Sequence, residues 1–213
     1  MYARDSQLTG RLRLRHLLEA TEAKGEEMAA ERPRFHKLAR EDSAPRVVSS
    51  FNLFQTPEPL AARLAGLLGK PGRTLEPSAG LGRLYRALRA ASANCPIVLV
   101  EQSPECCREL YAATEHDEHA RLVQGDFLEC TAASLGLFDC ILMNPPFKIG
   151  RDIKHIEHAR TMLAPGGRLV GLCAAGPKQR AHFVGSVEWI DLPPGSFKSE
   201  GTAVNAAIVI IDN

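Results

Sequence analysis

The stretch Phe138-Asp139-Cys140-Ile141-Leu142-Met143-Asn144-Pro145-Pro146-Phe147 decides how the rest of the sequence is interpreted. Its first six residues are mostly apolar and predict a buried strand at 138–143. Proline has no backbone N–H and cannot continue a sheet ladder, so the two prolines predict a rigid turn directly after this strand. That turn fixes the Asn144 side-chain oxygen and the Pro145 carbonyl as two acceptors beside the Phe147 ring. Two acceptors and an aromatic face suit a planar group with an exocyclic NH2.

Around this stretch, short β-rich segments alternate with helical ones from residue 73 onward, which is typical of a parallel sheet covered by helices. We expect strands at 73–76, 96–101, 120–123, 138–143, 168–173, 188–191 and 206–211. Helices are expected at 82–92, 104–114 and 152–163, the last ended by Pro165-Gly166-Gly167. The predicted fold is therefore α/β: a Rossmann-like, seven-stranded, mostly parallel sheet flanked by helices.

An earlier helix begins near residue 56, with Thr56 as the expected N-cap and Pro57 as the first helical residue. Its expected buried face consists of Leu60, Leu64, Leu67 and Leu68. Residues 1–50 are polar and rich in charge, and leucines at near-helical spacing between residues 8 and 18 predict an amphipathic helix, with a second at 22–32. We therefore divide the chain into a helical N-terminal extension, 1–50, and an α/β domain, 51–213.

The composition excludes several classes of protein. Of 213 residues, 45% are hydrophobic and 24% are charged, as in ordinary globular domains, and the net charge of +1 gives no global attraction to nucleic acid or acidic lipid. Any polyanion must then be held by a local basic patch. The six cysteines lie inside or beside apolar runs, so we expect reduced thiols and a cytoplasmic location, and because they include no Cys-x-x-Cys pair we expect no metal site. No signal peptide and no apolar run of about 18 residues is found, so we expect no membrane association.

Residues that directly follow the other strands are candidates for ligand contacts, because open α/β sheets bind ligands outside the carboxyl ends of their strands. The turn Glu76-Pro77-Ser78-Ala79-Gly80-Leu81-Gly82 is made of small residues. Gly80 and Gly82 would let the backbone approach a ligand and leave helix N–H groups pointing at it. Packing alone also selects such turns, so both interpretations stay open here.

Two further strand ends carry an acid. Glu101, after Ile97-Val98-Leu99-Val100, is placed to accept hydrogen bonds from two ribose hydroxyls, although a solvated strand-end carboxylate is an equally ordinary interpretation. In Gly125-Asp126-Phe127, Asp126 could accept from an adenine amino group while Phe127 packs on a ring, or Asp126 could simply cap the turn.

These motifs occur in a fixed order: Phe54-Gln55-Thr56-Pro57, Glu76-Pro77-Ser78-Ala79-Gly80, Glu101, Gly125-Asp126-Phe127 and Asn144-Pro145-Pro146-Phe147. In this order, residues 51–213 resemble the class I S-adenosylmethionine-dependent methyltransferases. Within that class they are most similar to the amino-methyltransferases of nucleic-acid bases, above all the DNA adenine-N6 enzymes with the motif order of the gamma group.

The resemblance implies roles for individual residues. S-adenosyl-L-methionine would be the cofactor, bound by Thr56, Pro57, Glu76, Pro77, Ser78, Ala79, Gly80, Glu101, Asp126, Phe127 and Asn144. The catalytic turn would be Asn144, Pro145, Pro146 and Phe147, and a base rotated out of its stack would enter between the cofactor and Phe147. Hydrogen bonds from its NH2 to Asn144 and the Pro145 carbonyl would localise the nitrogen lone pair for attack on the methyl group. Cytosine-C5 chemistry is excluded because no cysteine follows a proline.

The remaining substrate contacts lie near the catalytic turn and in the segment 195–202. Phe197 is the candidate that packs on the base, and Lys148 and Lys198 are candidate substrate contacts; a solvent-exposed hairpin tip is the alternative for Phe197. Lys148, Arg151 and Lys154 are a candidate basic patch or a solvated helix face. We interpret His155 and His158 as structural or surface residues.

DNA methyltransferases that read a sequence usually carry a separate target-recognition region, and this chain ends soon after its last strand. We therefore expect low sequence selectivity, a specificity partner or homodimer, or a structured RNA substrate. The expected function is transfer of a methyl group to adenine N6 in DNA. The alternatives are an rRNA base amino-methyltransferase, a protein-glutamine methyltransferase, or a non-catalytic cofactor-binding subunit.

Overall fold

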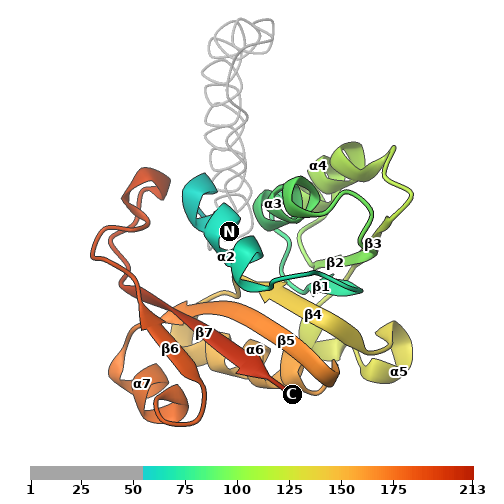
Figure 1. The fold of residues 1–213 in the computed structure, drawn as a ribbon. Coiled ribbons are helices and arrows are strands. Elements are labelled where there is room, and N and C mark those ends of the chain that lie inside the picture. Colours follow the sequence, from blue (N-terminus) through green and yellow to red (C-terminus); the bar gives the residue numbers. More distant parts are fainter. Residues whose placement is uncertain (1–54) are drawn as a thin grey trace, which may run out of the picture. The chain divides into compact units, whose positions relative to one another are not determined.

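The computed structural model describes residues 55–213, which form a seven-stranded sheet with the order β3-β2-β1-β4-β5-β7-β6 (Figure 1). Strands β1 to β5 pair in parallel, whereas β7 is antiparallel to both β5 and β6. The predicted Rossmann-like, mostly parallel sheet is confirmed. Its strands are β1 (Thr74–Glu76), β2 (Ile97–Glu101), β3 (Ala120–Gln124), β4 (Phe138–Met143), β5 (Leu163–Ala174), β6 (Glu188–Asp191) and β7 (Ala206–Asp212).

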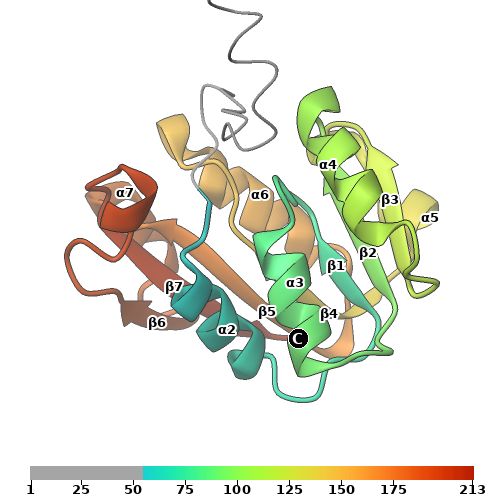
Figure 2. The same cartoon turned by 90° about the horizontal axis from the view of Figure 1, so that it is seen from above.

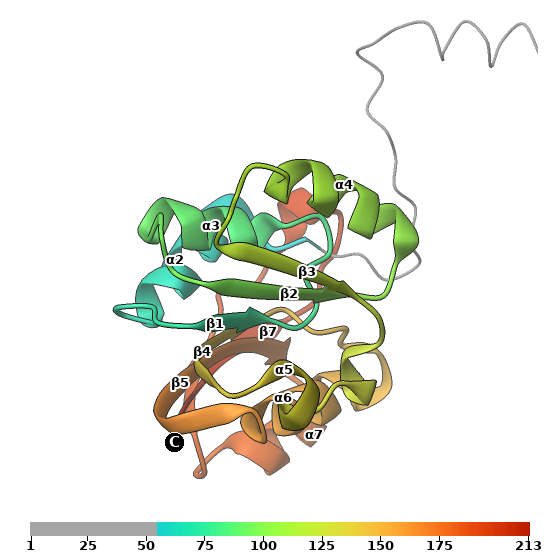
Figure 3. The ribbon, with the colours of Figure 1, turned by 90° about the vertical axis from the view of Figure 1, so that its right-hand side faces the viewer.

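Helices cover both faces of the sheet. Figure 3 shows α2 (Glu58–Leu67), α3 (Arg83–Ala91) and α4 (Pro104–Thr114) on one face, and α5 (Ala132–Leu135), α6 (Arg151–Arg160) and α7 (Pro177–Phe183) on the other. Helices α2 and α3 lie side by side (Figure 2). Short 3-10 turns complete the fold at η1 (Phe127–Glu129), η2 (Lys148–Gly150) and η3 (Lys198–Glu200).

Strand β4 shows why both faces are covered. Its side chains alternate between the two hydrophobic clusters: Cys140 and Leu142 belong to the cluster with α2 and α3, and Ile141 and Met143 to the cluster with α6. Because successive side chains of a strand point to opposite faces, a continuous apolar run is stable only when both faces are packed. The chain leaves β1 towards β2 and β3 and returns on its other side as β4, so the switch point of the topology lies between β1 and β4.

The start of α2 differs from the expectation. Pro57, with φ −53° and ψ 142°, is itself the N-cap residue, and its carbonyl accepts the first helical hydrogen bond from Ala61 N at 2.8 Å. Thr56 does not cap the helix, because its hydroxyl accepts a hydrogen bond from Asn144 instead. The expected buried face is otherwise found, with Leu60, Leu64 and Leu68 in the core and Leu67 partly buried.

The end of α6 also differs. The helix stops at Arg160 because Met162 turns into the core and its carbonyl accepts from Phe138 N at 2.9 Å, which starts the pairing of β5 with β4. Pro165-Gly166-Gly167 therefore lies inside β5 instead of ending a helix. Gly166 N donates to the Asn213 carbonyl, and Asn213 N donates to the Gly167 carbonyl, so this segment pairs with the last residue of the chain.

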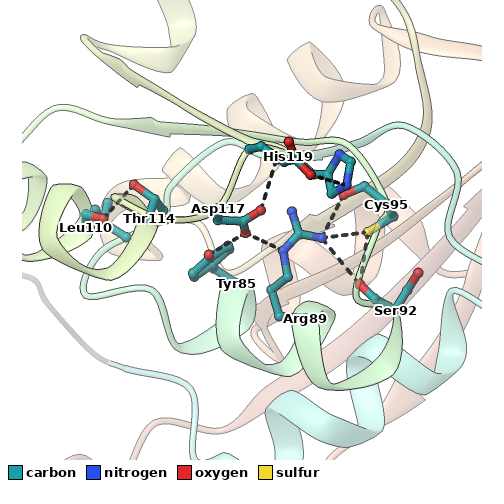
Figure 4. A network of polar contacts seen from close by, with 9 residues as sticks. Tyr85, Arg89, Ser92, Cys95, Leu110, Thr114, Asp117 and His119 are labelled. Atoms are coloured by element: carbon teal, nitrogen blue, oxygen red, sulfur yellow. Dashed lines mark hydrogen bonds and ion pairs between the residues drawn. The ribbon is translucent and has the colours of Figure 1, made fainter.

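A partly buried polar network links α3 to the segment between α4 and β3 (Figure 4). Asp117 accepts from the Tyr85 hydroxyl at 2.6 Å and from the Arg89 guanidinium, which also donates to the Cys95 carbonyl at 2.7 Å. Burial and the hydrogen bond to Asp117 raise the pKa of Tyr85 to about 12. The network lies away from the residues that line the cavity described below and holds the fold together.

The helices predicted within residues 1–50 lie outside the described residues. Within 55–213, no helix is long and apolar enough to cross a bilayer. All six cysteines of the chain fall in this range, all carry free thiols, and five of them are buried.

Candidate cofactor and catalytic site

A cavity opens at the carboxyl ends of β1 to β4, where the topology predicts a ligand site. It brings together most of the predicted site residues: Thr56, Glu76, Pro77, Ser78, Ala79, Gly80, Glu101, Asp126, Phe127, Asn144, Pro145, Pro146, Phe147 and Lys148. Three predicted residues, Pro57, Phe197 and Lys198, do not line it.

Asn144 is held at the end of β4 by a residue from a distant part of the chain. Its Nδ2 donates to the Thr56 Oγ1 at 3.1 Å, and Thr56 is almost completely buried. With the NH2 end of the amide directed at Thr56, Oδ1 is the acceptor end that the side chain can offer to a ligand. Thr56, expected both at a helix start and in the cofactor site, thus lines the cavity and contacts the Asn144 amide.

Phe147 forms a wall of the cavity and is supported from behind. The Phe197 ring packs edge-on against it, with ring centroids 6.5 Å apart. Phe197 has no exposed surface and belongs to the core cluster of α2 and α3. The hairpin-tip alternative is therefore wrong, and in this structure the ring contacts Phe147 instead of the cavity.

Glu101 is fixed at the end of β2 by two backbone donors. Gly80 N donates to its Oε2 at 2.8 Å, and Ser103 N donates to its Oε1 at 2.7 Å. This carboxylate is therefore not a freely solvated strand end. Each oxygen keeps a second lone pair, so the group can still accept two hydrogen bonds from a ligand.

The two glycines of the turn after β1 serve packing and positioning. The Gly80 N–H holds Glu101 instead of pointing at a ligand, and Gly82 does not line the cavity. Gly82 has φ +77°, and a Cβ there would come within 2.9 Å of Leu110 on α4. Gly80 still lines the cavity, where its backbone can approach a ligand, whereas Gly82 serves the close approach of α3 to α4, the packing alternative.

Glu76, at the end of β1, is the most unusual group in the cavity. It is 1% exposed, and its Oε2 has no hydrogen-bond partner within residues 55–213. Burial raises the pKa of Glu76 well above its usual value; Arg86 lowers the pKa and Glu101 raises it further. A buried carboxyl with an unused oxygen in a cavity is suited to a ligand that brings a hydrogen-bond donor or a positive charge.

Asp126 and Phe127 close the side of the cavity next to β3. Asp126 Oδ1 caps η1 by accepting from Leu128 N at 2.9 Å, and its Oδ2 lies 3.9 Å from Arg151. Phe127 is 2% exposed and packs on the rings of His158 and His155, at 4.9 and 5.8 Å between centroids. Asp126 is thus both a capping residue and a cavity acceptor.

His155 is a cavity residue that the sequence interpretation missed. It is 4% exposed, its Nδ1 lies 3.5 Å from the Ser78 hydroxyl, and its Nε2 has no partner within the described part of the chain. Burial and the charge of Arg151 lower its pKa to about 4, so the ring is neutral at pH 7. The signal was present in the sequence, because Asp152, His155, Ile156 and Ala159 have the spacing of one helix face, and all four are buried.

Basic side chains collect beside the turn at residues 144–147. Lys148 and Arg151 line the cavity, and Lys178 from α7 reaches over Gly150. Lys154, also expected in this patch, is exposed on α6 and does not line the cavity. The patch therefore combines two residues that follow the turn with one residue that sequence proximity does not reveal.

The chemistry of the cavity fits S-adenosyl-L-methionine. The carboxylates of the cavity are Glu76, Glu101 and Asp126. They can accept hydrogen bonds from the ammonium group, the hydroxyls and the amino group of the cofactor. The apolar walls at Ala79, Leu81, Leu84 and Phe127 can pack against an adenine ring. The strongest indication of such a ligand is the buried Glu76 Oε2, because it has no hydrogen-bond partner within the described residues.

The sequence matches the family model of the methyltransferase small domain over residues 56–182, more than half of the chain. No curated protein is significantly similar to it.

Three solved structures illustrate the fold. Protein PH1948 from Pyrococcus horikoshii is 19% identical with a TM-score of 0.61, covering 83% of this chain and 94% of that one. Atu636 from Agrobacterium tumefaciens, a predicted O-methyltransferase, is 22% identical with a TM-score of 0.55, covering 72% and 80%. An RNA methyltransferase from Salinibacter ruber in complex with S-adenosyl-L-homocysteine is 17% identical with a TM-score of 0.52, covering 74% and 92%. These identities show a shared fold.

The family match runs from residue 56 to residue 182 in α7 and so includes all the predicted residues that line the cavity, and a structural neighbour carries the demethylated cofactor. S-adenosyl-L-methionine is therefore the cofactor, and the chain belongs to the methyltransferase small domain family of S-adenosylmethionine-dependent methyltransferases.

Proposed function

We propose that this methyltransferase transfers its methyl group to the exocyclic amino group of a nucleic-acid base, with adenine N6 in DNA as the favoured target. The observation that carries the proposal is the Asn144-Pro145-Pro146-Phe147 turn in the wall of the cavity. The Asn144 amide is oriented there by Thr56, beside an aromatic ring that is supported from behind. This arrangement suits a flat ring that bears an NH2 group.

Residues at three strand ends bind different parts of the cofactor. Glu101, with both oxygens already aligned by backbone donors, accepts from the ribose hydroxyls. Glu76 receives the amino group of the methionine part, which provides the partner that its Oε2 lacks within the described residues. Asp126 accepts from the adenine amino group, and Thr56, Ser78 and Phe127 shape the walls. When bound, S-adenosyl-L-methionine supplies an electrophilic methyl group on a sulfonium centre.

The catalytic turn prepares the substrate nitrogen. The lone pair of an exocyclic NH2 is delocalised into the ring, which makes the group a poor nucleophile. Asn144 Oδ1 and the Pro145 carbonyl accept hydrogen bonds from the two N–H groups of this NH2. These hydrogen bonds favour a tetrahedral nitrogen and so localise the lone pair. Pro145 and Pro146 keep the two acceptors rigid, which limits the reorganisation needed during transfer.

Phe147 stacks on the target base. Phe197 packs behind the Phe147 ring and holds it in place. A phenyl ring held by an edge-on partner is already ordered, so less conformational entropy is lost when a base stacks on it than with a mobile ring. Lys148 lines the cavity and is placed to contact the backbone phosphates of the substrate, and we propose the same role for the exposed Lys198 in η3.

A base in RNA is the second candidate. It is favoured by the shared fold of the Salinibacter ruber RNA methyltransferase. Both candidates use the same chemistry at Asn144, and they differ in the strand that carries the base. Methylation rates of DNA and RNA, compared under the same conditions, distinguish the two candidates.

Replacing Asn144 by Ala tests the proposal. The variant should lose methyl transfer by at least about a hundredfold, as expected when a preorganised hydrogen-bonding group at the reacting centre is removed. Binding of S-adenosyl-L-homocysteine, measured by calorimetry, should change little.

Lys154→Ala is the matched control, because Lys154 follows the same turn but is exposed and does not line the cavity. Its transfer rate should stay within about twofold of the wild type. Survival of most of the activity in Asn144→Ala would show that this side chain does not hold the amino group.

A further inference from the structure

Ile149, two residues after the catalytic turn, has a conformation that its own chemistry disfavours. Its φ of 58° and ψ of 30° place it in the left-handed region, and it is the one residue other than glycine with positive φ within 55–213. A β-branched side chain crowds the backbone in this region. Such strain persists where the surrounding structure enforces it, and it is concentrated at functional sites.

Burial does not explain the choice of isoleucine here. The Ile149 side chain is 86% exposed, the highest value among the exposed large hydrophobic residues of the described chain. Glycine would remove the strain, and a polar residue would be better hydrated. The sequence nevertheless places a branched apolar side chain at the surface, between two residues that line the cavity, Lys148 and Arg151.

The surroundings of Ile149 are cationic. Lys148 precedes it, Arg151 follows it, and the Lys178 ammonium lies over Gly150, 2.7 Å from where a Cβ on that glycine would stand. Two acids face this segment. Asp126 lies 3.9 Å from Arg151, and Asp152 is buried, accepting from Ala174 N and from the Gln179 amide. The surface near the cavity therefore presents one apolar side chain among three cations.

We propose that Ile149 is a wedge that enters the base stack of the substrate strand and fills the space left when the target base rotates into the cavity. The inference rests on the proposed function, because it requires a base that leaves its stack. Apolar side chains that insert between bases are a known way to stabilise unstacked nucleic acid, and the surrounding cations match the flanking phosphates. The fixed left-handed backbone directs the side chain out of the protein and keeps it beside the catalytic turn.

Ile149→Gly removes the wedge and relieves the strain, so its thermal midpoint should equal or exceed that of the wild type. The substrates are two DNA duplexes with a single adenine, paired with thymine in one and placed opposite an abasic site in the other. If the wild type methylates only RNA, the same pair is made in RNA. If Ile149 is a wedge, kcat/KM of Ile149→Gly on the paired duplex should be about tenfold or more below that of the wild type. On the abasic duplex, where unstacking the adenine costs less, it should stay within about twofold of the wild type.

Two further variants complete the design. Ile149→Leu keeps an apolar wedge and should retain most of the activity on the paired duplex. Tyr111→Ala removes an exposed apolar side chain of α4, 70% exposed, and should affect neither substrate. An equal loss of Ile149→Gly on both duplexes, or no loss on either, overturns the wedge. A wild type that methylates no nucleic acid instead overturns the proposed function, and the wedge with it.

Discussion

Glu76 is the residue at which ligand binding and stability oppose each other. Burial raises its pKa well above the usual value, so the folded state prefers the protonated form. A group with a raised folded pKa contributes stability that is fully present below its unfolded pKa and is lost as the pH rises through its folded pKa. At neutral and higher pH the buried carboxyl therefore weakens the fold of the ligand-free protein, which is the cost of keeping an acceptor for the cofactor.

Glu76→Gln should make the ligand-free protein more stable at pH 8, by roughly 3 °C in Tm for each kcal/mol gained in a chain of this length. The same variant should bind S-adenosyl-L-homocysteine at least about tenfold more weakly, because the negative charge for the ammonium group is lost. Thermal scans from pH 4 to pH 8 and calorimetry measure both effects. The stability gain should vanish at acid pH, where Glu76 itself is protonated; a gain that persists there would show that desolvation of the charge is not its cause.

At the scale of elements, α6 is the helix that joins the site to the C-terminal part of the sheet. Its first turn carries Asp152, which has no exposed surface and accepts from Ala174 N at the end of β5 and from the Gln179 Nε2 of α7, both at 2.9 Å. About one turn further along the same helix, His155 lines the cavity. Asp152 thus ties α6, which follows the turn at residues 144–147, to β5 and α7.

Asp152→Ala should destabilise the fold by about 3 kcal/mol, because Ala174 N and the side-chain amide of the buried Gln179 lose their acceptor. At this chain length that loss lowers Tm by roughly 6–12 °C. The control is Glu157→Ala on the same helix, where the carboxylate forms partly exposed pairs with Arg160 and His182 and is worth about 0–1 kcal/mol. Equal melting temperatures for the two variants would contradict the role given to Asp152.

The elements were largely predictable, because apolar runs and helix signals are local. β4 and α4 have the predicted bounds. The misses involve partners that are distant in sequence. Thr56 is a good N-cap by type, yet its hydroxyl is used by Asn144, 88 positions away, and Pro165-Gly166-Gly167 continues a strand because the last residue of the chain pairs with it.

At the scale of the molecule, the order of the motifs predicts one site because the carboxyl ends of parallel strands meet at one edge of the sheet. The structure places Glu76, Glu101, Asp126 and Asn144 around one cavity. The sequence could not reveal that Lys178 joins Lys148 and Arg151, because that meeting depends on how α7 packs against η2. A chain with a net charge of +1 thus presents a local basic patch beside the turn at residues 144–147.

The central claim, methyl transfer to an exocyclic amino group of a base, is tested most directly by the position of the methyl group in the product. The full-length protein is incubated with methyl-labelled S-adenosyl-L-methionine and either DNA or total RNA, and the digested nucleosides are separated and identified by mass spectrometry. We expect label on an exocyclic nitrogen, with N6-methyladenine from DNA as the favoured product, and at least about a hundredfold less label with Asn144→Ala. Label on a ring carbon, on a ribose oxygen or on protein alone would contradict the claim.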